Sequence, residues 1–499
     1  MPIDLTKIKY CKGMQCPKIL WMDLHMPEKA GVSESDESAF DMGNKVGELA
    51  REYFGKPPVV TFSSRDKMVG ETRRLINNRS KAIAEASFSY DSNFCSVDIL
   101  LSKRNGYELI EVKKSSAAED EGADGVASYY LDDMAYQYYV LTNCGIKITK
   151  ASIMQLNRNY IRKGDLSLRD LFVITNCTGH ITGMQEDVVE NINAFKDIMI
   201  QKTEPDMQIG AECMRCVYAN WCLRRLPENN IFEIGWGMRR NKKNNAYESG
   251  IITFNDVLRH DIGLSDKQLR QVNTEVMNLP PHIEKKAIKA FLTQVKYPLY
   301  HLDFESYQQI IPLWDNVSPY MQIPFQYSLH IQKKPCGPTK HKEFLGKEGI
   351  DPRRELAERL CADIPMGACV IAYNMNFEKM IIRALAQLFP NISKHLMEIH
   401  DNMTDLMKPF QAGMYYCRKM GGSYSIKNVL PALCPGDPEV DYKKLDLISN
   451  GSEAMNAYAF LHEKASGEIE KIRKALLAYC RTDTLAMVKV LNRLYEIVK

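Results

Sequence analysis

A short alternating segment in the last third of the chain constrains its fold more than any other feature. Residues 297–305 read Tyr-Pro-Leu-Tyr-His-Leu-Asp-Phe-Glu, so apolar and polar side chains alternate. This period of two predicts a β-strand with Asp303 and Glu305 on one face. Neighbouring carboxylates repel, and the pair becomes favourable when Mg²⁺ or Mn²⁺ lies between them, because these hard cations prefer oxygen ligands. A lone Asp-x-Glu also suits the solvated face of an edge strand, so the surrounding sequence must decide.

Two further acids in this part of the chain could join the pair. Glu378 follows an apolar run at 368–371, which predicts a strand, and stands in the first turns of a helical segment that continues to residue 389. Tyr479 and Asp483 are four residues apart in a helical segment and therefore share one helix face. Alone, they would be a half-buried tyrosine and an exposed acid. The Asp-x-Glu pair is what favours a shared site.

In this order the motifs resemble the DEDD superfamily of 3′–5′ exonucleases, which have a ribonuclease-H-like fold. Asp-x-Glu matches the first motif, and Asn-x-Asn-Phe-Glu matches the second with Glu378 where Asp is usual. Tyr-x-x-x-Asp matches the third motif of the tyrosine subclass, and residues 422–430 are similar to the Ser-Leu-Lys helix start that precedes it. The resemblance implies two-metal hydrolysis of phosphodiester bonds, with Tyr479 orienting the attacking water. The carboxylates implied to hold the cations are Asp303, Glu305, Glu378 and Asp483.

A hairpin with charged residues is expected in the N-terminal half. Residues 94–101 predict a strand that carries Asp98, and the turn at 103–106 leads into a second strand at 107–113. Glu111 and Lys113 share one face of that second strand. Asp followed by Glu-x-Lys across a hairpin resembles the PD-(D/E)XK nucleases. There Asp98 and Glu111 would bind the metal, and Lys113 would stabilise the hydroxide or the charge at phosphorus. A solvated hairpin face with a Glu–Lys pair is the alternative.

Two flanking segments extend the resemblance to RecB-like nucleases. Residues 132–141 are similar to their glutamine-containing helix, which implies that Gln137 lies near the metal. Residues 43–48 are similar to the glycine-led helix that opens their active site. Many relatives have a metal-binding histidine where Gly47 stands, and Glu48 is the candidate to bind metal instead.

The cysteines point to a metal cluster. The chain has 14 of them and no apolar signal peptide in residues 1–30, so we expect a cytoplasmic protein with reduced thiols. Cys213, Cys216 and Cys222 form a Cys-x2-Cys-x5-Cys motif that needs a fourth ligand. Cys16 is similar to the first cluster cysteine of iron–sulfur RecB-like nucleases, which implies a [4Fe-4S] cluster. Four thiolates also suit Zn²⁺, and Cys11 is a competing fourth ligand.

Length and charge bound the possible functions. At 499 residues the chain can form two or three domains. It has no run of about 20 apolar residues, so we expect no membrane span. The net charge of only +3 means that any phosphate-binding surface must be local. Basic clusters at 73–74, 224–225 and 239–243 suit such contacts and suit a solvated surface equally well.

The sequence therefore predicts an α/β protein in three parts. We expect a restriction-endonuclease-like, RecB-like domain with the cysteine cluster at 1–225, a helical connector at 226–294 and a ribonuclease-H-like DEDD domain at 295–499. The arrangement resembles a bacterial family with both nuclease modules in one chain, and implies a metal-dependent DNA nuclease with two active sites, in repair or defence. A 3′–5′ exonuclease acting on RNA, or a nucleic-acid-binding scaffold with degenerate sites, is the alternative.

Overall fold

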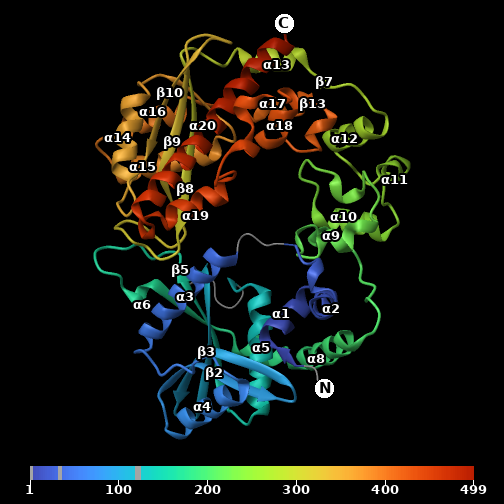
Figure 1. Ribbon diagram of the computed structural model, residues 1–499, viewed down its shortest axis with the longest axis vertical. Coiled ribbons are helices and arrows are strands. Elements are labelled where there is room, and N and C mark those ends of the chain that lie inside the picture. The colour runs from blue at the N-terminus through green and yellow to red at the C-terminus, as the bar shows by residue number, and fades with distance from the viewer. Residues whose placement is uncertain (1–3, 32–35, 118–124) are drawn as a thin grey trace. The chain divides into compact units, whose positions relative to one another are not determined.

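The computed structural model describes residues 4–31, 36–117 and 125–499. It is an α/β protein that divides into two compact units, each described by itself (Figure 1). The first unit contains Met1–Ile209, Cys213–Arg224 and Gln309–Met321. The second unit contains Gly210–Glu212, Arg225–Gln308 and Gln322–Lys499. Residues 226–294, expected to form a connector, are therefore grouped with the second unit. The link between the first two strands of the second sheet is grouped with the first unit.

The first unit is built on a six-stranded sheet of order β1-β3-β4-β5-β6, with β2 paired to β3. The strands are Leu5–Thr6 (β1), Ala82–Tyr90 (β2), Asn93–Lys103 (β3), Gly106–Ala117 (β4), Ile148–Asn157 (β5) and Phe172–Asn176 (β6). β3 and β4 form the expected antiparallel hairpin, with Ile99 opposite Ile110 and Lys103 opposite Gly106. Gly106 has a φ of +149°, a conformation that favours glycine in this tight turn.

Helices cover both faces of this sheet. They are Lys7–Gln15 (α1), Pro17–His25 (α2), Asp36–Tyr53 (α3), Arg65–Asn77 (α4), Ser128–Asn143 (α5), Leu168–Leu171 (α6), Thr178–Gly183 (α7), Gln185–Ile200 (α8) and Ala219–Cys222 (α9). Tyr136 of α5 packs in a core with Leu109 of β4, whereas Val46 of α3 packs in another core with Ile110. Because successive strand residues point to opposite faces, α5 and α3 lie on opposite sides of the hairpin.

The second unit has a five-stranded sheet of order β10-β9-β8-β11-β12, in which β8 is central. Its strands are Leu299–Gln309 (β8), Met321–Gln332 (β9), Thr339–Leu345 (β10), Cys369–Ala372 (β11) and Met403–Asp405 (β12), and a separate two-stranded sheet joins His282–Ile283 (β7) to Tyr415–Tyr416 (β13). The predicted strand at 297–305 is confirmed. β8 runs parallel to β11, with Tyr300 opposite Val370, so the edge-strand alternative for Asp-x-Glu is excluded.

The two faces of β8 meet different helices. The helices of this unit are Arg240–Glu248 (α10), Phe254–Arg259 (α11), Asp266–Val276 (α12), Lys285–Leu292 (α13), Arg353–Asp363 (α14), Asn376–Leu388 (α15), Ser393–Asp401 (α16), Lys408–Gln411 (α17), Ile426–Leu433 (α18), Gly451–Ala459 (α19) and Ser466–Ile497 (α20). Leu302 and Phe304 share a core with Ile381 of α15. The opposite face reaches α20, where the Cys480 thiol lies 3.5 Å from Oδ2 of Asp303.

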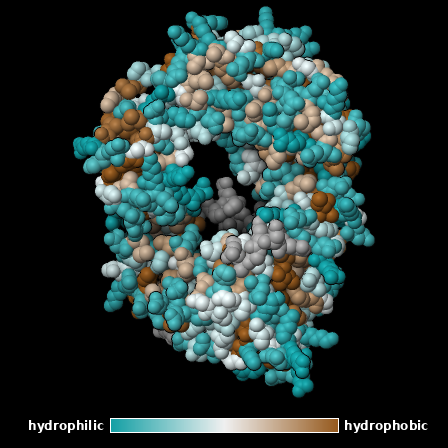
Figure 2. Space-filling model, turned by 180° about the vertical axis from the view of Figure 1, so that it is seen from behind, coloured by the Kyte–Doolittle hydropathy of each residue, from teal (hydrophilic) through white to brown (hydrophobic). Residues whose placement is uncertain are grey.

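The surface is largely hydrophilic on the face shown in Figure 2, where hydrophobic side chains form separate patches. Among the described residues, no helix combines the length and the apolar character that a bilayer crossing requires.

Two candidate carboxylate sites and a cysteine cluster

Four carboxylates converge on the polar face of β8, and we call this group the β8 site. Asp303 and Glu305 come from β8, Glu378 from the first turn of α15, and Asp483 from the middle of α20. The side chains are deeply placed: Glu305 is only 8% exposed and Glu378 only 2%. The structure thus brings together all four acids that the three motifs predicted.

The electrostatics of the β8 site show how close these groups are. Burial raises the pKa of Asp303 well above its usual value, and the charges of Asp483, Glu305 and Glu378 raise it further. Burial likewise raises the pKa of Glu305, with added repulsion from Asp483 and Glu378. Burial raises the pKa of Asp483 to about 6. Placing several charged carboxylates this close together is unfavourable, and a divalent cation bound between them would remove the repulsion.

The loop before α15 positions Glu378. Asn374 has a φ of +67°, a left-handed conformation that asparagine tolerates better than most residues. Oδ1 of Asp405 accepts hydrogen bonds of 2.9 Å from the backbone N–H groups of Asn374 and Met407. Burial, with a smaller contribution from Asp405, raises the pKa of Glu378 to about 8. Its Oε2 is buried and has no hydrogen-bond partner among the described residues. A buried oxygen of this kind suits a metal ligand.

Two tyrosines and a lysine complete the β8 site. Oη of Tyr442 donates a hydrogen bond of 2.5 Å to Oδ1 of Asp483. Tyr479, one helical turn before Asp483, is 5% exposed, and burial raises its pKa. Lys427 of α18 lies close enough to lower the pKa of both Glu305 and Asp483. Tyr442 lies in a short 3-10 segment without a recognisable motif, so sequence reasoning missed it.

The hairpin carries a second group, called here the hairpin site. Oδ2 of Asp98 accepts a 2.7 Å hydrogen bond from the backbone N–H of Val112, which ties β3 to β4 just beyond their last paired residues. Nζ of Lys113 donates to Oε1 of Glu111 at 2.8 Å. Nε2 of Gln137, on α5, donates to Oε2 of Glu111 at 2.8 Å. The structure brings all four residues together at one end of the hairpin.

Two residues at the hairpin site were not anticipated from the sequence. Asp133 of α5 accepts from Nζ of Lys113 at 2.5 Å and from Nε2 of Gln137 at 3.0 Å. Lys7 of α1 donates to Oε1 of Glu111 at 3.0 Å. Asp133 stands four residues before Gln137 on one helix face, which could have indicated it. No local pattern marks Lys7.

The hairpin site mixes charges of both signs, unlike the β8 site. Burial and the neighbouring Glu111 raise the pKa of Asp98 to about 7. Burial alone would raise the pKa of Glu111, but Lys113 and Lys7 lower it well below its usual value. Burial opposes the charge on Lys113, yet Glu111 and Asp133 raise its pKa, so the ammonium stays charged. Lys113 can therefore stabilise negative charge.

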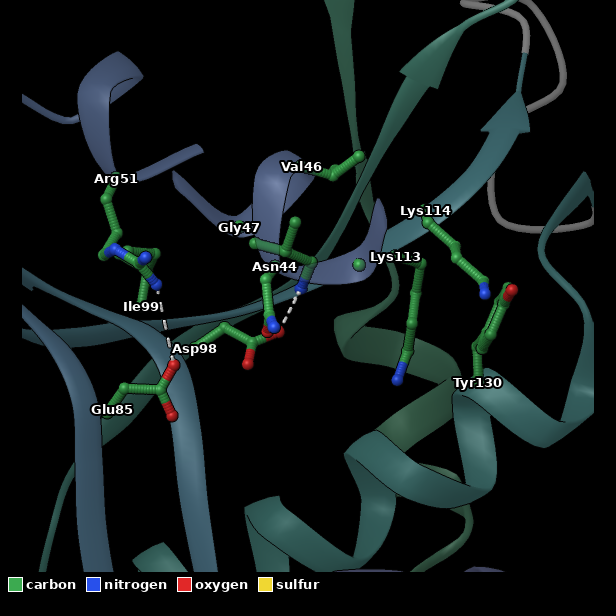
Figure 3. A pocket seen from close by; sticks show the side chains of 12 residues that line it. Asn44, Val46, Gly47, Arg51, Glu85, Asp98, Ile99, Lys113, Lys114 and Tyr130 are labelled. Carbon is green, nitrogen blue, oxygen red and sulfur yellow. Dashed lines mark hydrogen bonds and ion pairs between the residues drawn. The ribbon is translucent and has the colours of Figure 1, made fainter. Parts of the chain in front are cut away.

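A pocket of about 530 Å³ adjoins the hairpin site. Asp98 and Lys113 reach into it, and Arg51 pairs with Glu85 at 3.9 Å (Figure 3). Gly47 lines the pocket, whereas Glu48 is exposed and is not among the lining residues. One residue step turns a helix by about 100°, so Glu48 faces away from the position that Gly47 occupies. Glu85 of β2 is the additional carboxylate at this pocket.

The four cysteines predicted to form a cluster lie near one another. Cys16, Cys216 and Cys222 pack against a small core that includes Trp21. Burial raises the pKa of the Cys222 thiol, and Cys216, Cys213 and Cys16 raise it further. We call these four residues the cysteine cluster. The site joins the start of α2 to the segment that follows α8.

Cys11, the competing ligand, lies elsewhere. It lines a separate pocket of about 690 Å³ together with Lys113 and Asp133. Burial, with a contribution from Asp133, raises the pKa of its thiol to about 12. Its neighbours are therefore those of the hairpin site, and Cys16 is the residue that reaches the cysteine cluster.

Residues 300–425 match the model of a family described as a domain of unknown function, DUF2779. The matched region includes Asp303, Glu305 and Glu378, and it ends before Tyr479 and Asp483. A search of curated proteins found no match.

Proposed function

We propose that this protein is a metal-dependent nuclease that hydrolyses DNA phosphodiester bonds, with a 3′–5′ exonuclease site at the β8 site. One observation carries the proposal. Four carboxylates that are far apart in the sequence meet at one buried position, and they are the residues that match three exonuclease motifs in order. The central place of β8 in its sheet supports a ribonuclease-H-like fold for the second unit.

Divalent cations at the β8 site would activate the attacking water and stabilise the leaving 3′ oxygen. Glu378 Oε2, buried and unpaired among the described residues, and the repelling acids beside it fit this demand. Tyr479 would orient the water. Tyr442 holds one oxygen of Asp483, which fixes the direction of the other. Lys427, whose charge lowers the pKa of Glu305 and Asp483, would bind a substrate phosphate.

A second nuclease centre of the PD-(D/E)XK type is proposed at the hairpin site. Asp98 and Glu111 would hold Mg²⁺ or Mn²⁺, and Gln137 orients Glu111 through its 2.8 Å hydrogen bond. Lys113 carries the fixed positive charge that would stabilise the pentacovalent phosphorus. The strand order and the helices on both faces of the first sheet support a restriction-endonuclease-like fold.

We propose that the cysteine cluster holds a [4Fe-4S] group in a cytoplasmic protein whose thiols stay reduced. The resemblance to iron–sulfur RecB-like nucleases favours this over zinc, because those proteins place one cysteine before the nuclease core and three after it, as Cys16 and the Cys213, Cys216 and Cys222 motif are placed here.

The test is digestion of end-labelled single-stranded DNA and RNA of one sequence with Mn²⁺, after anaerobic purification. We expect the wild type to shorten DNA stepwise from its 3′ end, and Asp303→Asn to abolish this. Residual cleavage should disappear with Glu111→Gln. Glu470→Gln, an exposed acid on α20, is the matched control and should leave activity unchanged.

Each other outcome has a clear meaning. Faster shortening of RNA than of DNA would show that the substrate is RNA and not DNA. Binding without cleavage of either polymer would show that the protein is a nucleic-acid-binding scaffold and not a nuclease. Stepwise cleavage that persists in Asp303→Asn would refute the β8 site as its source.

A further inference from the structure

One of the atoms at the β8 site that could bind a metal is a sulfur. The Sγ atom of Cys480, an oxygen of Asp303 and an oxygen of Glu305 lie within 4.8 Å of one another. The thiol points at Asp303, with Sγ 3.5 Å from Oδ2 and 3.8 Å from the backbone oxygen. Cys480 is fully buried, so this position is set by packing and not by a solvent-exposed rotamer.

A second observation marks the same position as a ligand site. Glu305 is 8% exposed, and Asp483 and Glu378 lie close enough to raise its pKa beyond the effect of burial. Glu378 is 2% exposed, and its Oε2 has no hydrogen-bond partner among the described residues. Burying a carboxylate oxygen without a partner is costly unless a cation completes its environment.

We propose that the cation position between Asp303 and Glu305 binds a thiophilic divalent cation such as Zn²⁺ through the Cys480 sulfur, as well as Mn²⁺ or Mg²⁺ through the carboxylates. This rests on the proposed function, and it names a metal preference that oxygen ligands alone would not give. Soft thiolate ligands select zinc and cadmium over magnesium, which prefers oxygen. On binding, the S–H bond breaks, a metal–sulfur bond forms and the proton leaves to solvent, with no electron transferred.

The inference is tested by displacement of Mn²⁺ with Cd²⁺ in the full-length protein. Free Mn²⁺ gives an electron paramagnetic resonance signal that bound Mn²⁺ largely loses, so displaced ions can be counted. Every sample carries Glu111→Gln, which weakens binding at the hairpin site. Cd²⁺ that enters the cysteine cluster displaces no Mn²⁺ and does not disturb the readout.

We expect Cys480→Ala to raise the Cd²⁺ concentration for half-displacement at least tenfold, while Mn²⁺ affinity changes less than threefold. Cys480→Ser should behave like alanine, because a hydroxyl is a hard and weak ligand. In both variants the ultraviolet absorbance from metal–thiolate bonds should decrease by the amount that one thiolate contributes. Cys417→Ala, a buried cysteine in another core, is the control and should match the wild type.

Equal half-displacement in wild type and both Cys480 variants would overturn the inference and leave the proposed function standing. Unchanged Mn²⁺ binding in Asp303→Asn would instead refute the β8 site as a metal site, and the inference with it. If Cys480→Ala does not fold, Cys480→Ser supplies the comparison. The serine side chain is only slightly smaller than that of cysteine, and it keeps a hydrogen-bond donor for Asp303.

Discussion

Tyr442 and Asp483 are joined by a hydrogen bond of 2.5 Å although they are 41 residues apart. The bond connects the loop between α18 and α19 to the middle of α20. Tyr479 also lies within hydrogen-bonding reach of Asp483, so two tyrosines surround this carboxylate. The orientation of one proposed metal ligand therefore depends on a loop that no motif identifies.

Replacing this tyrosine should weaken catalysis without disturbing the fold. A hydrogen bond to a charged group contributes about 1.5–3 kcal/mol, so we expect Tyr442→Phe to lower kcat by about tenfold or more. Mn²⁺ affinity should fall in parallel, as for a residue that acts through Asp483. The measurement is single-turnover digestion with thermal unfolding as a check. Tyr458→Phe, which loses a bond to a backbone carbonyl in the same unit, should leave turnover intact.

Mn²⁺ should stabilise the protein through the β8 site. A ligand that binds only the folded state at 100 times its Kd contributes about 2.7 kcal/mol. We expect the Tm in saturating Mn²⁺ to exceed that in EDTA by several degrees. Asp303→Asn should reduce this difference and raise the Tm in EDTA, because it removes a carboxyl whose ionised form is disfavoured by burial and by the neighbouring acids. Differential scanning fluorimetry measures both effects, and a wild-type Tm indifferent to metal would contradict the prediction.

The metal-free protein should lose stability as the pH rises. The pKa of Glu378 is about 8 in the folded protein, against an ordinary value of 4.5. The folded state therefore binds more protons than the unfolded state between these values. The stabilising contribution is complete below about pH 4.5 and disappears as the pH rises through 8, with a slope of at most about 1.4 kcal/mol per pH unit.

The measurement is urea unfolding in EDTA from pH 5 to 8. Glu378→Gln should flatten the pH dependence relative to wild type, because the amide does not titrate. Parallel curves for the two proteins would show that Glu378 keeps an ordinary pKa.

The two lysines of the hairpin site should differ in their effect on stability. Lys113 contacts Glu111 at 2.8 Å and Asp133 at 2.5 Å. Lys7 contacts the same two acids at the longer distances of 3.0 Å and 3.9 Å. Breaking a buried pair costs about 3–5 kcal/mol. We expect Lys113→Met to approach that loss and Lys7→Met to lose about 1 kcal/mol in the free energy of unfolding, measured by urea unfolding. A larger loss for Lys7→Met would reverse the assigned roles.

The cysteine cluster should depend on Cys16 and not on Cys11. Cys222→Ser and Cys16→Ser should lose the brown colour and most of the bound iron, because each removes one of four thiolates. Cys11→Ser should keep both, since Cys11 lies beside Lys113 and Asp133. Visible absorbance and iron analysis after anaerobic purification give the answer. A colourless wild-type protein with stoichiometric zinc would show that the cysteine cluster binds zinc and not iron.

Local sequence patterns predicted the framework of both sites. The period of two at 297–305 predicted β8 and the shared face of its two acids, and helical spacing placed Tyr479 one turn from Asp483. The hairpin turn at 103–106 and the second strand were also predicted. These features follow from backbone geometry, which repeats over a few residues and can be recognised in a short window of sequence.

The remaining parts of the sites depend on contacts that sequence spacing does not encode. Lys7 reaches Glu111 across 104 residues, and Asp405 holds the loop at Asn374 across 31. Glu48 illustrates the same limit, because one residue step on α3 decides whether a side chain meets the pocket. The central position of β8 is likewise a matter of strand order.

The sequence by itself determined which residues can carry chemistry and which elements they occupy. Carboxylates at fixed spacing, a Glu-x-Lys strand and spaced cysteines are properties of the chain. Only the tertiary structure decided which of them meet: Cys480 beside Asp303, Tyr442 on Asp483, and Cys16 with the cysteine cluster in place of Cys11. The reason is physical, because burial of distant segments against one another sets these distances and the pKa values that follow from them.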